Sequence, residues 1–517
     1  MIMALFLAML TLLGRLVLVQ FQSSLRINQL GLLGLSYLVG IGVFTWVLYL
    51  FMVLGGHATL SSTLILAVVL IVVGLYLSLR HLSTPLALWR TRWTAQSTAD
   101  LLTITPLIPI FVLSFYVSYW TPIYWSDSVY YYDGVGKILA VDGSIYSDAL
   151  KRPLCWCNGI FVHGQPSLLV HSLHAVAYLL KDEHVAVLYS GFFASLVLVF
   201  GFVRWEPEDE EEHPITQRLL ASAPWRLILL AFATVPFVFA MGYVAVSSLP
   251  GAVYFFAAIL VWKRFMERPS RQLAVLSGAL FAMCSWTRGE AIYFYLPVLL
   301  LTLAIATIRP NIRSHIVAFL IPLLLLDVSR YAFIFTSGQF LEYARDVPLP
   351  HVDFLALLAV VAGAVLVTRV GARQQEWLAT AMVAAGVLVL VAVIALIALN
   401  FKGVSDSATQ LFRLLRDPVW GLTGIVVATA LVSPSLFRNT ERLIFMIIIA
   451  FVAVRVLLYA HIVNLNLSDN TITSDGNRVL LYMWPVAIYW LSCSKELHSL
   501  FASLSKLPFR IPSRVSG

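Results

Sequence analysis

Charged side chains are scarce in this chain: Asp, Glu, Lys and Arg make up 12% of its 517 residues, about half of the ~25% usual in soluble domains. Hydrophobic residues make up 60%, and the mean hydropathy is +0.88. A soluble protein of this size needs more surface charge, so a cytosolic enzyme, a secreted disulfide scaffold and a disordered protein are excluded. The apolar runs are too long and continuous for a transmembrane barrel with alternating strands. We therefore expect an all-α, polytopic membrane protein.

Cysteine is also scarce, with four residues in the chain, too few for a disulfide framework. Cys155 and Cys157 form a C-x-C pair in a loop, which we interpret as two unpaired small residues, with a disulfide or a metal site as alternatives. The first residues resemble a signal peptide, but Arg15 interrupts the apolar run and no small-x-small cleavage site follows cleanly. We expect them to remain as a first helix.

Long apolar segments predict about 14–15 membrane spans, each near the ~20 residues that a spanning helix needs. They are 2–20, 30–54, 58–79, 101–120, 185–203, 226–246, 250–265, 272–287, 291–308, 315–335, 353–371, 376–399, 418–433, 442–462 and 478–494. Residues 166–180 are apolar but short and carry two histidines, which is typical of an interfacial helix.

The net charge of +8 reflects an uneven distribution of Lys and Arg among the predicted loops. If 166–180 lies at the interface without crossing, the basic loops all fall on one side, as expected for the cytoplasm. This topology places 121–184, 336–352, 400–417 and 463–477 on the outer face and the C-terminus in the cytoplasm. It predicts a second interfacial helix within 400–417, and it accounts for the positive charge without nucleic acid.

The outer segment 121–184 is the longest predicted stretch between spans and the richest in polar residues. Asp127 closely follows the span 101–120, so we expect its carboxylate at the outer membrane–water boundary, in reach of water and lipid headgroups. Tyrosine and tryptophan side chains flank it, as they would in an ordinary aromatic belt. The residues by themselves leave open whether Asp127 is a functional carboxylate or an ordinary loop acid beside an aromatic belt.

Several short motifs, taken in order, resemble those of the GT-C glycosyltransferases. These are polytopic enzymes that use polyprenyl-phosphate sugars, such as the protein mannosyltransferases and the aminoarabinose transferases. The motifs are 127–131 (DSVYY), 143–146 (GSIY), 163–168 (HGQPSL), 242–250 (GYVAVSSLP), 278–290 (GALFAMCSWTRGE) and 477–485 (NRVLLYMWP). Their order agrees with the topology derived from charge.

The resemblance implies a GT-C-like fold that transfers a sugar, with inversion, to a glycan, lipid or protein acceptor on the outer face of the cell membrane. Asp127 matches the position of the base that deprotonates the acceptor, and Asp133 is the alternative base. Further substrate contacts are expected from Tyr131, His163, Glu290 and Glu342.

The phosphate of the polyprenyl donor should meet cations near the membrane interface, and arginine suits bidentate phosphate binding. Arg288, between two spans at the outer face, is the first candidate, and Arg478 at the start of the last span is the second. Arg330 is the third, although it stands three residues from Asp327 and is also explained by a neutralising pair.

Two positions depart from the family pattern. The first acidic pair reads Asp127-Ser128, and a later acidic position reads Ser247-Ser248. In the family those acids help to bind metal or to position the acceptor, so we assign no metal ligand and leave a divalent metal open as a cofactor. His171 and His174 share a helix face but lack a visible third ligand.

The sequence thus divides into three regions: further spans in 1–100, the GT-C-like module in 101–335, and C-terminal spans in 336–517. Two other functions stay open. A transporter or lipid flippase would explain buried charges, although its key charges should lie at the bilayer midplane. A scaffold with the GT-C fold but no catalysis is suggested by Ser128 and Ser248. A transfer assay separates the scaffold from the enzyme.

Overall fold

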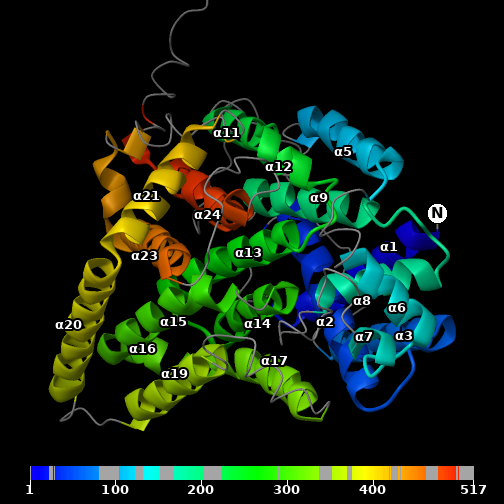
Figure 1. The fold of residues 1–517 in the computed structure, drawn as a ribbon, viewed down its shortest axis with the longest axis horizontal. Helices are drawn as coiled ribbons and strands as arrows, with labels where there is room; N and C mark the ends of the chain where they lie inside the picture. Colours follow the sequence, from blue (N-terminus) through cyan, green and yellow to red (C-terminus); the bar gives the residue numbers. More distant parts are fainter. Residues whose placement is uncertain are drawn as a thin grey trace, which may run out of the picture.

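The structure of the protein is a computed structural model. It describes residues 2–21, 27, 29–80, 104–123, 132–151, 168–202, 223–288, 291–336, 352–369, 375–417, 420, 429–430, 432–461, 475–496 and 499. Within these residues every regular element is a helix, and there is no strand. The all-α prediction is confirmed for this part of the chain (Figure 1).

The helices follow the predicted apolar segments closely. In chain order they are α1 (Ile2–Val19), α2 (Gln29–Val53), α3 (Leu60–Leu79), η2 (Thr105–Leu107), α5 (Ile108–Trp120), α6 (Gly134–Asp142), α7 (Asp148–Lys151), α8 (Leu169–Leu179), α9 (Val187–Phe202), α11 (Ala223–Ala233), α12 (Pro236–Met241), α13 (Ser248–Glu267), α14 (Arg271–Thr287), α15 (Ala291–Ile308), α16 (Pro310–Arg313), α17 (Ile316–Thr336), α19 (Val352–Arg369), α20 (Gln375–Leu399), α21 (Phe401–Arg416), η6 (Pro434–Phe437), α23 (Asn439–His461) and α24 (Asp475–Ser492).

Six helices among the described residues are long and apolar enough to cross a membrane. They are Ile2–Val19, Gln29–Val53, Leu60–Leu79, Ser248–Glu267, Ala291–Ile308 and Pro310–Phe333. The other predicted spans are shorter, broken or only partly described. The predicted span 226–246, for example, is divided into α11 and α12, because Pro236 at the start of α12 cannot continue the hydrogen bonding of a preceding helix.

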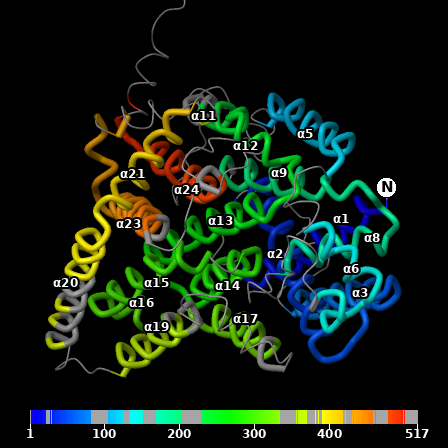
Figure 2. Tube along the Cα trace, viewed as in Figure 1, coloured from blue at the N-terminus to red at the C-terminus, as the bar shows by residue number. Residues whose placement is uncertain are grey.

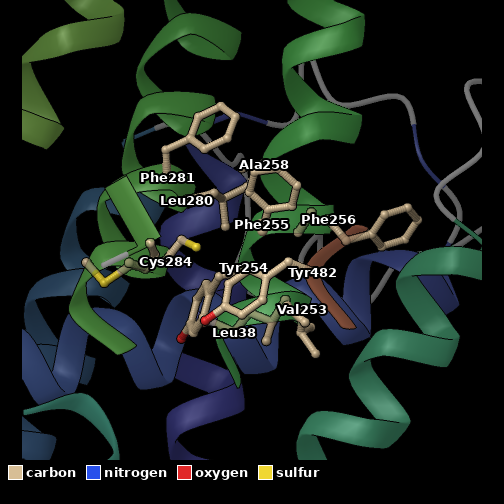
Figure 3. Packing of buried hydrophobic residues seen from close by; sticks show 14 of the residues in the cluster. Leu38, Val253, Tyr254, Phe255, Phe256, Ala258, Leu280, Phe281, Cys284 and Tyr482 are labelled. Carbon is tan, nitrogen blue, oxygen red and sulfur yellow. The ribbon is translucent and has the colours of Figure 1, made fainter. Parts of the chain in front are cut away.

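Helix α13 lies at the centre of the molecule, between α14, α24, α9 and α2 (Figures 1 and 2). Its aromatic side chains Tyr254, Phe255 and Phe256 are all fully buried. Figure 3 shows them among side chains of the neighbouring helices, including Leu38 of α2 and Tyr482 of α24. The Tyr254 hydroxyl donates to the Leu38 carbonyl at 2.6 Å, which satisfies its polar atom inside an apolar environment.

Glycines let some helix backbones approach unusually closely. A Cβ built on Gly278 of α14 would lie 1.9 Å from the carbonyl oxygen of Phe319 in α17. A Cβ built on Gly40 of α2 would lie 1.7 Å from the carbonyl oxygen of Leu10 in α1. Small residues at such crossings are typical of membrane helix packing, where close backbone contact replaces the hydrophobic driving force.

The segment predicted to be interfacial, 166–180, contains α8, a helix of 11 residues. At 1.5 Å per residue it is about 16 Å long, too short to cross the ~30 Å hydrocarbon core. Residues of α8 are buried against α6, α2 and other helices. The prediction of a helix that does not span is therefore consistent with its length.

The second predicted interfacial segment, 400–417, forms α21, which is bent by 98° from the end of α20. Asn400 lies at the bend: its side-chain oxygen accepts from Gly403 N at 3.0 Å, and its Nδ2 donates to the Ala460 carbonyl of α23 at 2.7 Å. The bend is thus held by hydrogen bonds to both sides.

Candidate functional site

Several predicted site residues lie outside the described residues. They are Asp127, Tyr131, His163, Glu290 and Glu342, and the pair Cys155 and Cys157 lies there too. The predictions for these residues stay predictions. The described candidates are Asp133, Arg288, Arg330 and Arg478.

Asp133 stands directly before α6 and is 3% exposed. Its Oδ2 lies 2.8 Å from Lys137 Nζ, one turn further along α6. Its Oδ1 accepts a short hydrogen bond from the Tyr178 hydroxyl of α8, and His174 Nδ1 lies 3.6 Å from the same oxygen. His174 Nε2 in turn lies 3.0 Å from the Tyr189 hydroxyl of α9. One carboxylate therefore connects α6 to α8 and, through His174, to α9.

The surroundings of Asp133 keep it ionised. Burial raises the pKa of the carboxyl, but the polar contact with His174 and the interactions with Lys137 and Tyr178 outweigh it and lower the pKa to about 2. Burial lowers the pKa of His174, against a smaller opposing effect of Asp133. An imidazole with lowered pKa beside a carboxylate of pKa about 2 makes Asp133 a poor proton acceptor near neutral pH. Its geometry suits a charged group that holds α6 against α8 better than it suits a general base.

The neighbouring residue Tyr132 ties this network to the central helix. Its hydroxyl lies 2.7 Å from Ser247 Oγ, and both groups are buried. On the other side its ring lies 5.3 Å from the His171 ring, tilted by 32°. Tyr132 is five positions after Asp127 in the sequence. The hydrogen bond therefore joins Tyr132 to the residue just before α13.

The first turn of α13 is where three segments meet. The Ser248 hydroxyl is buried and has no hydrogen-bond partner within the described residues. A Cβ built on Gly251 would lie 2.0 Å from the Tyr482 hydroxyl oxygen of α24 and 2.8 Å from Thr287 Oγ1 of α14. A larger residue at 251 would displace these hydroxyls, so Thr287 at the end of α14 and Tyr482 of α24 both lie close to α13 here.

Two of the predicted phosphate ligands belong to these segments. Arg288 follows Thr287 directly, and Arg478 stands one turn before Tyr482. Both arginines are partly exposed. The N-terminus of α13 carries the positive end of its helix dipole, which favours a negatively charged group nearby.

Arg330 has a different environment. It is 2% exposed within α17, and its Nη1 lies 3.1 Å from Asp327 Oδ1. Tyr49 of α2 donates to the Ser329 carbonyl at 3.1 Å, close beside this pair. An ion pair of this kind satisfies two buried charges, so the neutralising pair expected from the spacing is present. Whether Arg330 also binds phosphate stays a prediction.

Sequence reasoning missed Lys137, Tyr178 and Tyr189 as partners of the outer segment. The spacing of Asp133 and Lys137, four residues apart on one helix, was a readable signal for an ion pair. The contribution of Tyr189 was not readable, because it comes from a different helix.

The described residues contain no group of three or more His, Cys, Asp or Glu side chains that could hold a metal ion. His171 and His174 lie on one face of α8 but have different contacts. His171 contacts the Tyr132 ring, and His174 contacts Asp133 and Tyr189.

Comparisons of the chain with protein-family models, with curated proteins and with solved structures find no match. The assignment of function therefore depends on the residues and their arrangement.

Proposed function

We propose that the protein is a membrane glycosyltransferase of the GT-C type, which transfers a sugar from a polyprenyl-phosphate donor to an acceptor on the outer face of the cell membrane. The observation that carries the proposal is the meeting of three segments at the first turn of α13. Tyr132 reaches Ser247 from the segment after Asp127, while Gly251 contacts the ends of α14 and α24 that bear Arg288 and Arg478. This meeting of Tyr132, Thr287 and Tyr482, which stand near Asp127, Arg288 and Arg478 in the sequence, supports a shared site for the three residues.

In the proposed reaction the Asp127 carboxylate takes the proton from an acceptor hydroxyl or amine, which attacks the anomeric carbon of the sugar. The bond between that carbon and the phosphate oxygen breaks, and the electron pair leaves with the polyprenyl phosphate. Attack opposite the leaving group inverts the anomeric centre. Arg288 and Arg478 stabilise the charge that develops on the phosphate.

Asp133 has a supporting role in this proposal. With its pKa near 2 and three donors around its carboxylate, it stays charged and holds α6 against α8. We therefore assign the base to Asp127 and treat Asp133 as a positioning residue for the segment before it.

The test is transfer from a labelled polyprenyl-phosphate sugar in proteoliposomes. Asp127→Asn should lower the rate by about 10²–10⁴-fold, the usual contribution of a positioned base, without changing the elution profile of the purified protein. Asp142→Asn is the matched control, because Asp142 is an exposed acid of the same outer segment. Full transfer by Asp127→Asn would remove the assignment of the base.

Arg288→Gln should raise the donor KM and lower the rate, whereas Arg288→Lys should keep part of both, because lysine retains the charge and loses the bidentate geometry. If no variant and no wild-type preparation transfers sugar from any polyprenyl-phosphate donor, the scaffold interpretation based on Ser128 and Ser248 replaces the enzyme. The transporter alternative would explain the buried pair Asp327 and Arg330. Movement of a labelled lipid across the bilayer without transfer would support it.

A further inference from the structure

Helix α21 is amphipathic, and one of its sides faces the surroundings of the protein. The other side packs mainly against α23. Its buried residues are Ser407, Gln410, Leu411 and Leu414. The exposed side contains two large aromatic residues, Phe401 at 69% and Phe412 at 62% exposure. Its exposed basic residues are Lys402, Arg413 and Arg416. The helix therefore exposes apolar surface and positive charge together.

The aromatic and the basic residues form two separate lines along the exposed side. Phe401 and Phe412 are eleven residues apart, about three turns of an α-helix, so they lie nearly in line. Lys402 and Arg413 have the same spacing and form a second line, about 100° further around the axis. The spacing places Arg416 between the lines, with its guanidinium carbon 5.7 Å from the centre of the Phe412 ring. One edge of α21 thus suits hydrocarbon, and the other suits anions.

The bend at Asn400 gives α21 the orientation of a helix in a membrane surface. Helix α20 has 25 residues and is about 37 Å long, enough to cross the ~30 Å hydrocarbon core. If α20 crosses along the membrane normal, α21 runs nearly parallel to the membrane plane, because it is bent by 98° from the end of α20. Asn400 Nδ2 donates to the Ala460 carbonyl at 2.7 Å. The bend therefore lies where α23 also ends, at His461.

The apolar edge of α21 continues the exposed apolar face of α20. Leu390 and Ile394 of α20 are 58% and 56% exposed, and Leu399 at its end is 81% exposed. Phe401 follows directly after the bend, so one hydrocarbon phase can cover both helices. This continuity favours lipid over a protein partner as the occupant of the exposed side.

The charge of α21 matches an anionic lipid surface. Its three basic residues outnumber Asp406, the single acid within the helix, and Asp417 follows directly after the helix. A basic amphipathic helix with large apolar side chains is the pattern that binds anionic lipid at a membrane surface.

We propose that α21 lies in the membrane surface and binds the headgroups of anionic phospholipids. Phe401 and Phe412 insert among the acyl chains, while Lys402 and Arg413 contact the phosphates of the same leaflet. All four residues are exposed, so lipids reach them without entering the protein. The proposal is separate from the transfer reaction and does not depend on it.

The test is hydrogen–deuterium exchange of the full-length protein in nanodiscs made with phosphatidylglycerol or with phosphatidylcholine alone. Amides of 401–416 should exchange at least about fivefold more slowly with phosphatidylglycerol, because each basic residue near an anionic surface contributes about that factor. Lys402→Gln/Arg413→Gln should remove most of the difference. Lys402→Arg/Arg413→Lys is the matched control and should keep it, because the charge is unchanged. Residues 60–79 of α3, which have no charged side chain, should exchange alike in both lipids.

Two further measurements separate the edges of the helix. Phe412→Ala should speed exchange of α21 in both lipids, because the apolar contact does not depend on headgroup charge. Native mass spectrometry of protein released from mixed nanodiscs should show fewer retained phosphatidylglycerol molecules for Lys402→Gln/Arg413→Gln than for the wild type.

Equal exchange and equal retention in the two lipids would overturn the proposal. So would an effect of phosphatidylglycerol that survives in Lys402→Gln/Arg413→Gln. Equal protection by millimolar inorganic phosphate in phosphatidylcholine nanodiscs would also overturn it, because the ligand would then be a free anion.

Discussion

Helices α13 and α3 are both long enough to cross a membrane, yet they occupy opposite environments. All of the apolar window of α13 is buried inside the protein, against 17% of that of α3. The buried helix is the less apolar of the two; it begins at Ser248, directly after Ser247, and contains Lys263 and Arg264 near its end. The exposed helix is mostly aliphatic and contains no charged residue over 60–79.

This difference reverses the arrangement of a soluble protein. In a membrane the surrounding solvent is apolar, so aliphatic side chains such as those of α3 can face outward, and polar groups are placed inside, where other helices satisfy them. Lys263, for example, is 7% exposed and lies 2.5 Å from Glu267 and 3.5 Å from Glu441 of α23. The comparison predicts that substitutions at buried positions of the central helices lower the stability of the protein strongly. Substitutions on the exposed face of helices such as α3 should lower it little.

The largest effect is expected from Gly278→Leu. A side chain there would meet the Phe319 backbone, which cannot move without separating α14 from α17. We expect a loss at or above the ~1–3 kcal/mol usual for overpacking, seen as little monodisperse protein after detergent extraction. Val72→Leu, at a site 58% exposed on α3, is the control and should purify normally. Normal behaviour of Gly278→Leu would show that this crossing is looser than the contact indicates.

The next effect is expected from Asp327→Ala, which leaves the Arg330 charge buried without its partner carboxylate. Loss of one member of a buried pair is typically destabilising by ~3–5 kcal/mol, measurable as a lower melting temperature in detergent. The double variant Asp327→Ala/Arg330→Met should recover most of the loss. If the double variant were as unstable as the single one, the charges would have a role beyond neutralising each other.

A smaller, pH-dependent effect is expected at Asp133. Its folded pKa of about 2 lies below the ordinary value of 3.8, so its stabilising contribution is present above pH 3.8 and is lost as the pH falls toward 2. Asp133→Asn should lower the melting temperature at pH 7 and should reduce the difference from the wild type as the pH falls below 4. Asp142→Asn should retain the wild-type profile. A constant difference between Asp133→Asn and the wild type at all pH values would contradict the ionised state.

The smallest effect is expected from Val72→Ala on the exposed face of α3. Surface substitutions are usually within ~0.5 kcal/mol, so the melting temperature in detergent should stay nearly the same. A loss as large as that of a buried residue would mean that α3 contacts another protein chain rather than lipid.

Much of the fold was predictable because spanning helices are encoded locally. The spans predicted at 30–54, 272–287 and 291–308 begin and end within a residue or two of α2, α14 and α15. The span 226–246 was wrong as a single helix. Its apolar composition predicted continuity, whereas Pro236 divides it into α11 and α12.

The candidate site was predictable in part. Arg288 was chosen from a motif and Asp133 as the alternative acid near Asp127, but the partners of Asp133 were not predicted, because Tyr178 and His174 lie more than 40 positions away. The ion pair of Asp327 and Arg330 was predictable, since residues three apart on a helix face each other. Local spacing thus predicts contacts within a helix but not those between helices.

The amino-acid sequence by itself determined that this is an all-helical protein with helices suited to a membrane, because hydropathy and length act on each segment separately. Only the tertiary structure decided that the least apolar of these helices is central, and that Tyr132, Thr287 and Tyr482 meet at the first turn of α13. The physical reason is that helix packing depends on close approaches such as that at Gly251, which join residues far apart in the chain.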